Sequence, residues 1–424
     1  MNMTYKEILP GVKLRVIESG RFETNCMSLS FLTEISDETA AQMTLLPRVL
    51  RRGTTKHPDM KALAAALDDM YGTRIEPVSR KFGDVMSGGF ICDFVDIDGD
   101  ALSGVTKLLG EVVFDPVLSD GIFLDDYVSG ECVNLIDEIK SEINNKMSYA
   151  FTKAGECVFE NSPYGVNELG SEATVEKTDA ASLYEFYRKL TTSAPCEIFF
   201  CGKYGAETVE KKILGMFGNC GRGKVSKLRR TVPVYAENKR VCEKMDIAQA
   251  SLVIGMKTDV TDIYHAKLVS SIIGGGTSSK LFTNVREKKS LCYSTGATFH
   301  SFENVMYMYA GIDPKNALVA EKAIMDEFEH CVHGDITDEE ISNAKKGIID
   351  DLLTIEDSIF SMEAFWLRAS LLGDGRTPSE AAVSVKNIDE ETIAKTVNNF
   401  CLSAVYLLTG LEGEKRERKL LSEH

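Results

Sequence analysis

The sequence predicts an α+β protein whose two halves have a related fold. Three observations support this class: short stretches of alternating apolar and polar residues, amphipathic helices between them in a mixed order, and a helix–strand unit that occurs twice. A doubly wound sheet would instead need a regular alternation of strand and helix. The chain has 424 residues, which is too long for one ordinary core and favours two or three domains.

The first predicted strands are short segments with apolar residues at every second position. Residues 13–19, 26–35 and 90–97 follow this pattern, which places one face of each strand in a core.

Three helices are predicted from apolar residues at helical spacing and from their end signals. The first covers residues 59–71, between a proline and a glycine, and the second continues from residue 127 past residue 142. The third begins at a capping box formed by Thr337 and Glu340 and is expected to continue over residues 338–367.

A unit of helix, turn, buried strand and glycine occurs twice. Residues 175–202 align with residues 385–410 when two residues are omitted before the last strand. The matched pairs are Val175/Val385, Asp179/Asp389, Leu183/Ile393, Ser193/Ser403, Ala194/Ala404 and Gly202/Gly410. A second pair of landmarks, Arg-Gly-Thr at 52–54 and Gly-Gly-Thr at 275–277, follows the same order. Duplication explains two ordered landmarks better than a chance match of one unit, which stays open.

One stretch near mid-chain, residues 218–239, is both glycine-rich and basic. Such a composition is typical of a linker. We therefore expect an N-terminal domain at 1–222, a linker at 223–239 and a C-terminal domain at 240–424.

Charge and cysteine usage exclude several partners and compartments. The formal net charge of −16 repels phosphate backbones and anionic lipids, so neither nucleic acid nor a membrane is an expected partner. Eleven cysteines without a CxxC pair favour free thiols over a disulfide framework. The N-terminus lacks an apolar core of signal-peptide length, and no run approaches the roughly 18 apolar residues of a membrane span. We expect a cytoplasmic protein.

The most specific motif is IIGGGTSSKLFTNVREKKSLCYSTGA, residues 272–297. A glycine-rich turn and two serines precede Leu-Phe, then Arg286-Glu287 and, seven residues after the arginine, Tyr293. This stretch resembles the insulysin/pitrilysin family, which includes the mitochondrial processing peptidase and its paired bacterial relatives. Residues 131–139 and 161–187 resemble the same family, and the resemblance covers nearly the whole chain.

The resemblance implies two homologous halves, each a twisted, mostly antiparallel sheet with helices packed on one face. Together they would form half of a peptidase clamshell around a peptide chamber. The family's catalytic helix carries His-x-x-Glu-His about nine residues before a Gly-Thr, so that two histidines bind zinc and the glutamate is the general base.

Counting back from Gly53-Thr54 puts Thr44, Pro47 and Arg48 at these three positions. Threonine is a poor zinc ligand, proline has no base, and a guanidinium stays protonated. Residues 43–54 still read as an amphipathic helix that can pack in a core without metal. We therefore expect neither a metal nor another cofactor.

Glu131 and Glu138 are two helical turns apart, and Glu138 falls where the family has its third zinc ligand. One carboxylate without its histidines is a weak transition-metal site, so a structural or solvated glutamate is the favoured interpretation. The register stays open because the Arg48 to Glu138 spacing is longer than usual for the family.

Arg286 and Tyr293 are the candidate substrate-binding residues. In the family the matching pair contacts the substrate backbone and the tetrahedral intermediate, and a neutral phenol and a guanidinium are suitable donors to an oxyanion. A surface arginine and a packed tyrosine are the alternative. His330 and His333 fall at a predicted helix end, where histidine favours the C-terminal dipole, and are not expected to bind metal.

Two functional hypotheses from different classes follow. The favoured one is a non-catalytic, zinc-less subunit, inactive alone, that contributes Arg286 and Tyr293 to a zinc-bearing paralogous chain of an insulinase-like metallopeptidase. The alternative is a homodimeric scaffold that binds peptides or proteins without proteolysis. An autonomous hydrolase with an unrecognised site is the least favoured.

Overall fold

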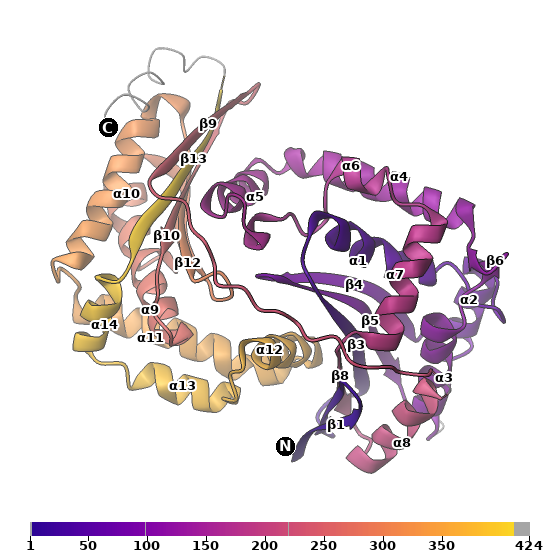
Figure 1. Cartoon of the computed structure of the whole chain (residues 1–424). Helices are drawn as coiled ribbons and strands as arrows, with labels where there is room; N and C mark the ends of the chain where they lie inside the picture. Colours follow the sequence, from indigo (N-terminus) through magenta and orange to yellow (C-terminus); the bar gives the residue numbers. More distant parts are fainter. Residues whose placement is uncertain (1, 98, 219, 411–424) are drawn as a thin grey trace. The chain divides into compact units, whose positions relative to one another are not determined.

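Figure 1 shows the computed structural model of the chain, which describes residues 2–97, 99–218 and 220–410. These residues form two compact units. Unit 1 contains residues up to Lys140, together with Val166–Thr231 and Glu356–Asp374. Unit 2 contains Ser141–Gly165, Val232–Ile355 and the residues from Gly375 onward.

Unit 1 has a six-stranded sheet in the order β1-β2-β8-β3-β5-β4. Its strands are β1 (Asn2–Leu9), β2 (Val12–Glu18), β3 (Thr24–Glu34), β4 (Arg74–Phe82), β5 (Val85–Val95) and β8 (Cys196–Gly202). All neighbours are antiparallel except β2 and β8. A separate two-stranded ribbon joins β6 (Leu118–Ser119) to β7 (Ile122–Phe123).

The helices of unit 1 pack on one face of this sheet, except α12, which covers the other face. They are α1 (Asp37–Leu50), α2 (Met60–Asp68), α3 (Ala101–Phe114), α4 (Asp125–Ser141), α6 (Glu172–Val175), α7 (Ala180–Ser193), α8 (Ala206–Phe217) and α12 (Ile359–Leu372). The alternating pattern of β2 puts Leu14 and Val16 in the core beneath α1, α3, α7 and α8. Arg15, between them, points to the other face, where its guanidinium lies 4.2 Å from the ring of Trp366 in α12.

Unit 2 has a five-stranded sheet in the order β11-β12-β10-β13-β9. Its strands are β9 (Lys239–Met245), β10 (Ala250–Lys257), β11 (Cys292–His300), β12 (Val305–Ile312) and β13 (Cys401–Gly410). Its helices are α5 (Lys146–Val158), α9 (Ile263–Gly274), α10 (Ala317–Val332), α11 (Asp338–Thr354), α13 (Pro378–Lys386) and α14 (Glu390–Val397), with a π-helix at Leu281–Lys288. Short 3₁₀ turns lie at Glu142–Asn144, Pro163–Gly165, Pro314–Asn316 and Ile355–Asp357.

The two sheets share one strand topology. The order β2-β8-β3-β5-β4 corresponds to β9-β13-β10-β12-β11. In each sheet one parallel pair, β2 with β8 or β9 with β13, contains the strand of the sequence repeat. The repeated aspartates have the same role, since Asp179 caps α7 and Asp389 caps α14. The predicted α+β class, with mostly antiparallel sheets, is confirmed.

Each sheet also receives one helix on its second face from the other half of the sequence. α5 packs on β10 and β13 of unit 2, where Ala150 and Ala154 share a core with Tyr406. A Cβ at Gly255 in β10 would collide with Val158 of α5, so glycine permits this close approach. α12 packs on β3 and β8 of unit 1 (Figure 1).

This exchange makes both compact units discontinuous in sequence, unlike the contiguous ranges 1–222 and 240–424 predicted above. The expected linker has neither helix nor strand from residue 220 to residue 238. It is nevertheless anchored, because Arg222 donates to the carbonyl of Thr191 and Arg230 pairs with the buried carboxylate of Asp84. Its first part therefore belongs to unit 1.

Two helix predictions are wrong in their extent. The helix expected to continue past residue 142 ends at Ser141, where a 3₁₀ turn follows. The helix expected over residues 338–367 ends at Thr354, and α12 begins at Ile359. Ser358 adopts an extended backbone and its side chain accepts from the Ser361 N–H, which caps a new helix. Apolar periodicity continues across the break, so only the cap marks it. Among the described residues, no helix combines the length and the apolar character needed to cross a bilayer.

Candidate functional site

The first group of candidate residues lies on α1 of unit 1. Ser36 and Thr39 form a capping box at its start, and the helix continues past Pro47, whose carbonyl accepts from the Arg51 N–H at 3.0 Å. Proline removes only one hydrogen bond in this last turn. Thr44 is 2% exposed, and its hydroxyl donates to the Glu168 carbonyl at 3.3 Å. The threonine is therefore engaged in the packing of unit 1.

Two arginines of this segment pair with the two candidate glutamates of α4. Arg48 Nη1 lies 2.8 Å from Glu138 Oε2, and Arg52 Nη1 lies 2.9 Å from Glu131 Oε1. The Arg52 guanidinium also stacks 5.0 Å from the centre of the Tyr127 ring. Arg48 of α1 and Arg52, which follows the end of α1, thus each place a guanidinium against a carboxylate of α4.

This arrangement does not suit a zinc ion. A protonated guanidinium cannot coordinate a metal, and its positive charge lies against Glu138, the one carboxylate aligned with a ligand position. Within the described part of the chain, no three His, Cys, Asp or Glu side chains are grouped as metal ligands. His330 and His333 end α10, where His330 Nδ1 lies 2.9 Å from Asp335 Oδ2.

The second group, Arg286 and Tyr293, lies in unit 2. Arg286 is in the π-helix Leu281–Lys288 and Tyr293 is near the start of β11. Ser290 between them has φ +50°, and both side chains line one hollow of about 540 Å³. The intervening Ser290-Leu-Cys predicts a helix that runs into a strand, and the structure has a helix, a turn and a strand here.

Both side chains are accessible in this hollow. Tyr293 is 65% exposed. The Arg286 guanidinium packs 4.6 Å from the centre of the Phe282 ring, and its Nε lies 3.7 Å from Glu287 Oε1, which also lines the hollow. The remaining wall includes Lys315, whose ammonium lies 2.8 Å from Asp313. A guanidinium, an ammonium and a phenol can together donate to carbonyl or carboxylate oxygens of a peptide.

The hollow also contains the thiol of Cys292. Burial raises the pKa of this thiol, and the nearby Arg286 only partly opposes that effect. The raised pKa favours the protonated thiol, which is a poor nucleophile. The groups around the hollow therefore suit binding rather than covalent chemistry.

Sequence reasoning missed three of the partners described here. Arg52 entered the sequence analysis only as part of the Arg-Gly-Thr landmark, and Asp313 and Lys315 were not considered. The antiparallel register of β11 and β12 pairs Cys292 with Ile312, which brings the residues after β12 beside the residues before β11. Strand pairing was the signal that could have located Asp313 and Lys315.

Comparison with known sequences gives consistent matches. The profile described as "Peptidase M16 inactive domain" matches residues 177–348. The chain is 26% identical over 412 residues to the "Probable inactive metalloprotease YmfF" of Bacillus subtilis, covering 95% of this chain and 97% of the relative. It is 24% identical over 264 residues to the "Uncharacterized zinc protease YmxG" of the same organism, covering 61% of each.

Comparison with solved structures gives the same fold. A conserved protein from Enterococcus faecalis V583 has a TM-score of 0.88 at 23% identity, covering 97% of this chain and 99% of that protein. A peptidase M16 inactive domain from Pseudomonas fluorescens has a TM-score of 0.80 at 16% identity, covering 97% of this chain and 98% of that domain. Profile and relatives agree, and the fold is consistent with them: the chain is similar to proteins of the M16 peptidase family, the insulysin/pitrilysin family that its motifs resemble.

Proposed function

We propose that this chain is the non-catalytic, zinc-less subunit of an M16 metallopeptidase. In this role it presents Arg286 and Tyr293 to a peptide whose scissile bond is held by a zinc-bearing, paralogous partner chain. The functional peptidase would then be a cytoplasmic heterodimer of two duplicated chains, like a processing peptidase, in which different chains bind the metal and the substrate. One chain supplies the metal, and this chain supplies donors to the substrate.

The observation that carries the proposal is the contrast between the two candidate groups. Arg48 occupies a predicted ligand position and pairs with Glu138, which removes the chemistry of a zinc helix. Arg286 and Tyr293, in contrast, line one hollow, where the Arg286 side chain is 40% and Tyr293 65% exposed. A guanidinium and a phenol there can stabilise a developing oxyanion.

The relatives add a second line of support. The matches in Bacillus subtilis include one protein described as a probable inactive metalloprotease and one described as a zinc protease. One organism can thus encode both kinds of chain that a divided peptidase needs. The equivalent strand topology of the two sheets supports the ancestral duplication.

The test is a peptide-cleavage assay on a complex of this chain with a zinc-bearing M16 chain encoded in the same genome. We expect Arg286→Ala and Tyr293→Phe to reduce kcat/KM by about 10- to 100-fold, as for the loss of one oxyanion donor. Lys288→Ala is the matched control, since this cation is on the same helix but does not line the hollow.

Full activity of the Arg286→Ala complex would contradict the donor role and favour the homodimeric scaffold. Metal analysis of the single purified chain supplies a second test. One zinc per chain, resistant to dialysis, would contradict the zinc-less assignment.

A further inference from the structure

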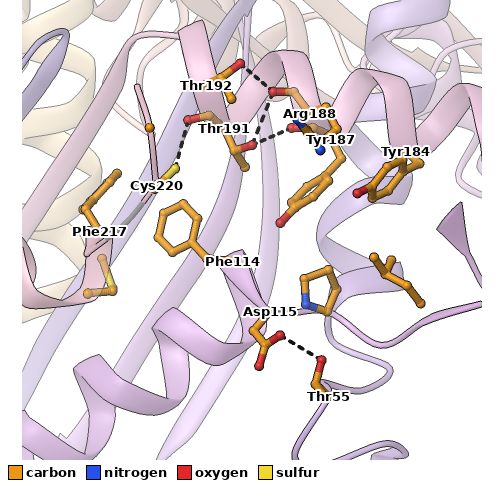
Figure 2. A pocket seen from close by; sticks show the side chains of 14 residues that line it. Thr55, Phe114, Asp115, Tyr184, Tyr187, Arg188, Thr191, Thr192, Phe217 and Cys220 are labelled. Carbon is orange, nitrogen blue, oxygen red and sulfur yellow. Dashed lines mark hydrogen bonds between the residues drawn. The ribbon is translucent and has the colours of Figure 1, made fainter. Parts of the chain in front are cut away.

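Unit 1 contains a cavity that none of the candidate residues above lines. It has a volume of about 710 Å³ and lies between the end of α3, the middle of α7 and the end of α8. Figure 2 shows the rings of Phe114 and Tyr187 in the middle of the view, with Cys220 and Phe217 to one side and Asp115 and Thr55 below. A volume of this size is typical of small-molecule sites, which span roughly 300–1,000 Å³.

Aromatic rings from three helices form the walls. Phe114 and Phe217 make one pair, with ring centroids 5.1 Å apart, and Tyr184 and Tyr187 make another, 5.7 Å apart. The first pair joins α3 to α8, while the second lies on α7. The two aromatic pairs offer ring faces and ring edges to a ligand in this space. Aromatic contacts of this kind favour a planar aromatic ring over an aliphatic group.

The cavity has one cation at its wall, Arg188 of α7. This side chain is exposed and has no ion pair with any acidic group in the ranges that the structure describes. That is unusual in a chain with a net charge of −16, where acidic partners are abundant. A guanidinium beside an aromatic cavity favours a carboxylate ligand, to which it can donate two hydrogen bonds.

The other polar groups restrict where the anionic end of a ligand can lie. Asp115 accepts from the Thr55 hydroxyl at 2.8 Å, and its charge repels a second carboxylate. Burial raises the pKa of the Tyr187 hydroxyl, with Cys220 and Asp115 acting in the same direction and Arg188 in the opposite one. The phenol therefore stays protonated and can donate. Arg188 and Tyr187 form the anion-accepting side of the cavity.

We propose that this cavity binds a small planar aromatic monocarboxylate, with its ring between the two aromatic pairs and its carboxylate on Arg188. Three features select this class: the volume, the paired rings and the single unpaired cation. The inference does not depend on the peptidase partnership, because it uses residues of unit 1 that the proposed function leaves unassigned.

The probe is 2-naphthoate, titrated calorimetrically into the full chain. Two analogues separate the contributions: 2-naphthamide keeps the ring without the charge, and octanoate keeps the charge without the ring. We expect 2-naphthoate to bind about tenfold more tightly than either analogue, since one charged hydrogen bond or one aromatic contact has roughly that effect.

Arg188→Gln should weaken 2-naphthoate about tenfold, to the level of the amide. The matched control is Lys189→Gln, an exposed cation on the same helix that does not line the cavity. Because Arg188 is exposed, its replacement leaves the core of unit 1 intact. Equal affinity of acid and amide, or an unchanged affinity of the Arg188→Gln variant, would overturn the proposal.

Thiol footprinting locates the bound probe. Saturating 2-naphthoate should slow alkylation of Cys220, which lines the cavity, and leave Cys242 and Cys401 of unit 2 unchanged as internal controls. Equal alkylation of Cys220 with and without bound probe would place the ligand elsewhere and overturn the site. Octanoate binding as tightly as 2-naphthoate would overturn the aromatic class, and no binding of 2-naphthoate at millimolar concentration would overturn the proposal altogether.

Discussion

Arg48 of α1 and Glu138 of α4 form an ion pair, with Nη1 and Oε2 2.8 Å apart across 90 residues of sequence. Arg52, two residues after the end of α1, pairs with Glu131 of the same α4. These pairs differ in exposure: the Glu138 side chain is 45% exposed and that of Glu131 only 11%. The difference decides how much each pair contributes to stability.

We predict a small coupling energy for Arg48 and Glu138. A double-mutant cycle with Arg48→Met and Glu138→Gln, measured by urea unfolding, should give about 0.5 kcal/mol, because exposed pairs are screened by water. Arg52→Met should cost about 1–3 kcal/mol, since it leaves the less exposed Glu131 carboxylate without its cation. Equal costs for Arg48→Met and Arg52→Met would contradict this ranking.

A second prediction concerns the pair that fixes α12 on the sheet of unit 1. Arg80 Nη1 lies 2.8 and 3.1 Å from the two oxygens of Glu363, whose side chain is 0% exposed. Arg80→Met should destabilise unit 1 by about 3–5 kcal/mol, because it leaves the buried carboxylate of Glu363 without its cation. Unfolding can be followed by the fluorescence of Trp366, the single tryptophan of the chain, which is also on α12.

The double variant Arg80→Met/Glu363→Leu is the control for this experiment. It removes both charges, so it should recover most of the lost stability. A double variant as unstable as Arg80→Met would indicate that packing, rather than the unpaired carboxylate, causes the loss.

A third prediction is the order in which the eleven cysteines react. Burial raises the pKa of Cys201 and of Cys331 to about 12, so only about 0.01% of each is thiolate at pH 8. Cys401 is exposed and should react first with a disulfide reagent. Reaction of all eleven thiols should require denaturation of the protein. The Cys401→Ser substitution should abolish the fast phase of the reaction with the disulfide reagent. A fast phase of several thiols in that variant would contradict the burial pattern.

A fourth prediction uses the caps of the repeated helices. Hydrogen bonds from Ser182 lower the pKa of Asp179 in the folded protein, and hydrogen bonds from Thr392 lower that of Asp389. A lowered folded pKa stabilises the fold above the unfolded value near 4, and this contribution is lost as the pH falls through the folded pKa. Asparagine still caps a helix but does not titrate.

Asp179→Asn should therefore lower the Tm at pH 6, and the difference from the parent should shrink as the pH approaches 3. Asp389→Asn should behave alike, since it occupies the equivalent position. Glu185→Gln, on the exposed side of α7, is the control. A Tm difference that stays constant between pH 6 and pH 3 would exclude titration of the cap as its cause.

A fifth prediction follows from the exchange of α5 and α12. A fragment of residues 240–424 lacks α5, and with it Ala150, Ala154 and Val158 from the core around Tyr406. It should bind a hydrophobic dye and unfold without cooperativity, because one face of its sheet is uncovered. A fragment of 141–424 restores α5 and should show a cooperative transition. Cooperative unfolding of 240–424 alone would contradict a structural need for α5.

The sequence by itself determined much of the local structure. Alternation located β2, β3 and β5 within a few residues, because one buried face imposes a period of two. Pro58 and the capping box of Thr337 marked the starts of α2 and α11, since helix-end signals are local interactions. The motif around Arg286 and Tyr293 led to the family, since it is compact in sequence.

Only the tertiary structure decided which distant groups meet. The pairing of Arg48 with Glu138, the burial of Glu363 beneath Arg80 and the cavity at Arg188 each depend on elements far apart in the chain. The exchange of α5 and α12 was likewise absent from the sequence pattern, because an apolar helical face does not specify the sheet that covers it. Periodicity and caps depend on neighbouring residues, whereas packing partners are chosen by the complementary shape and charge of whole surfaces.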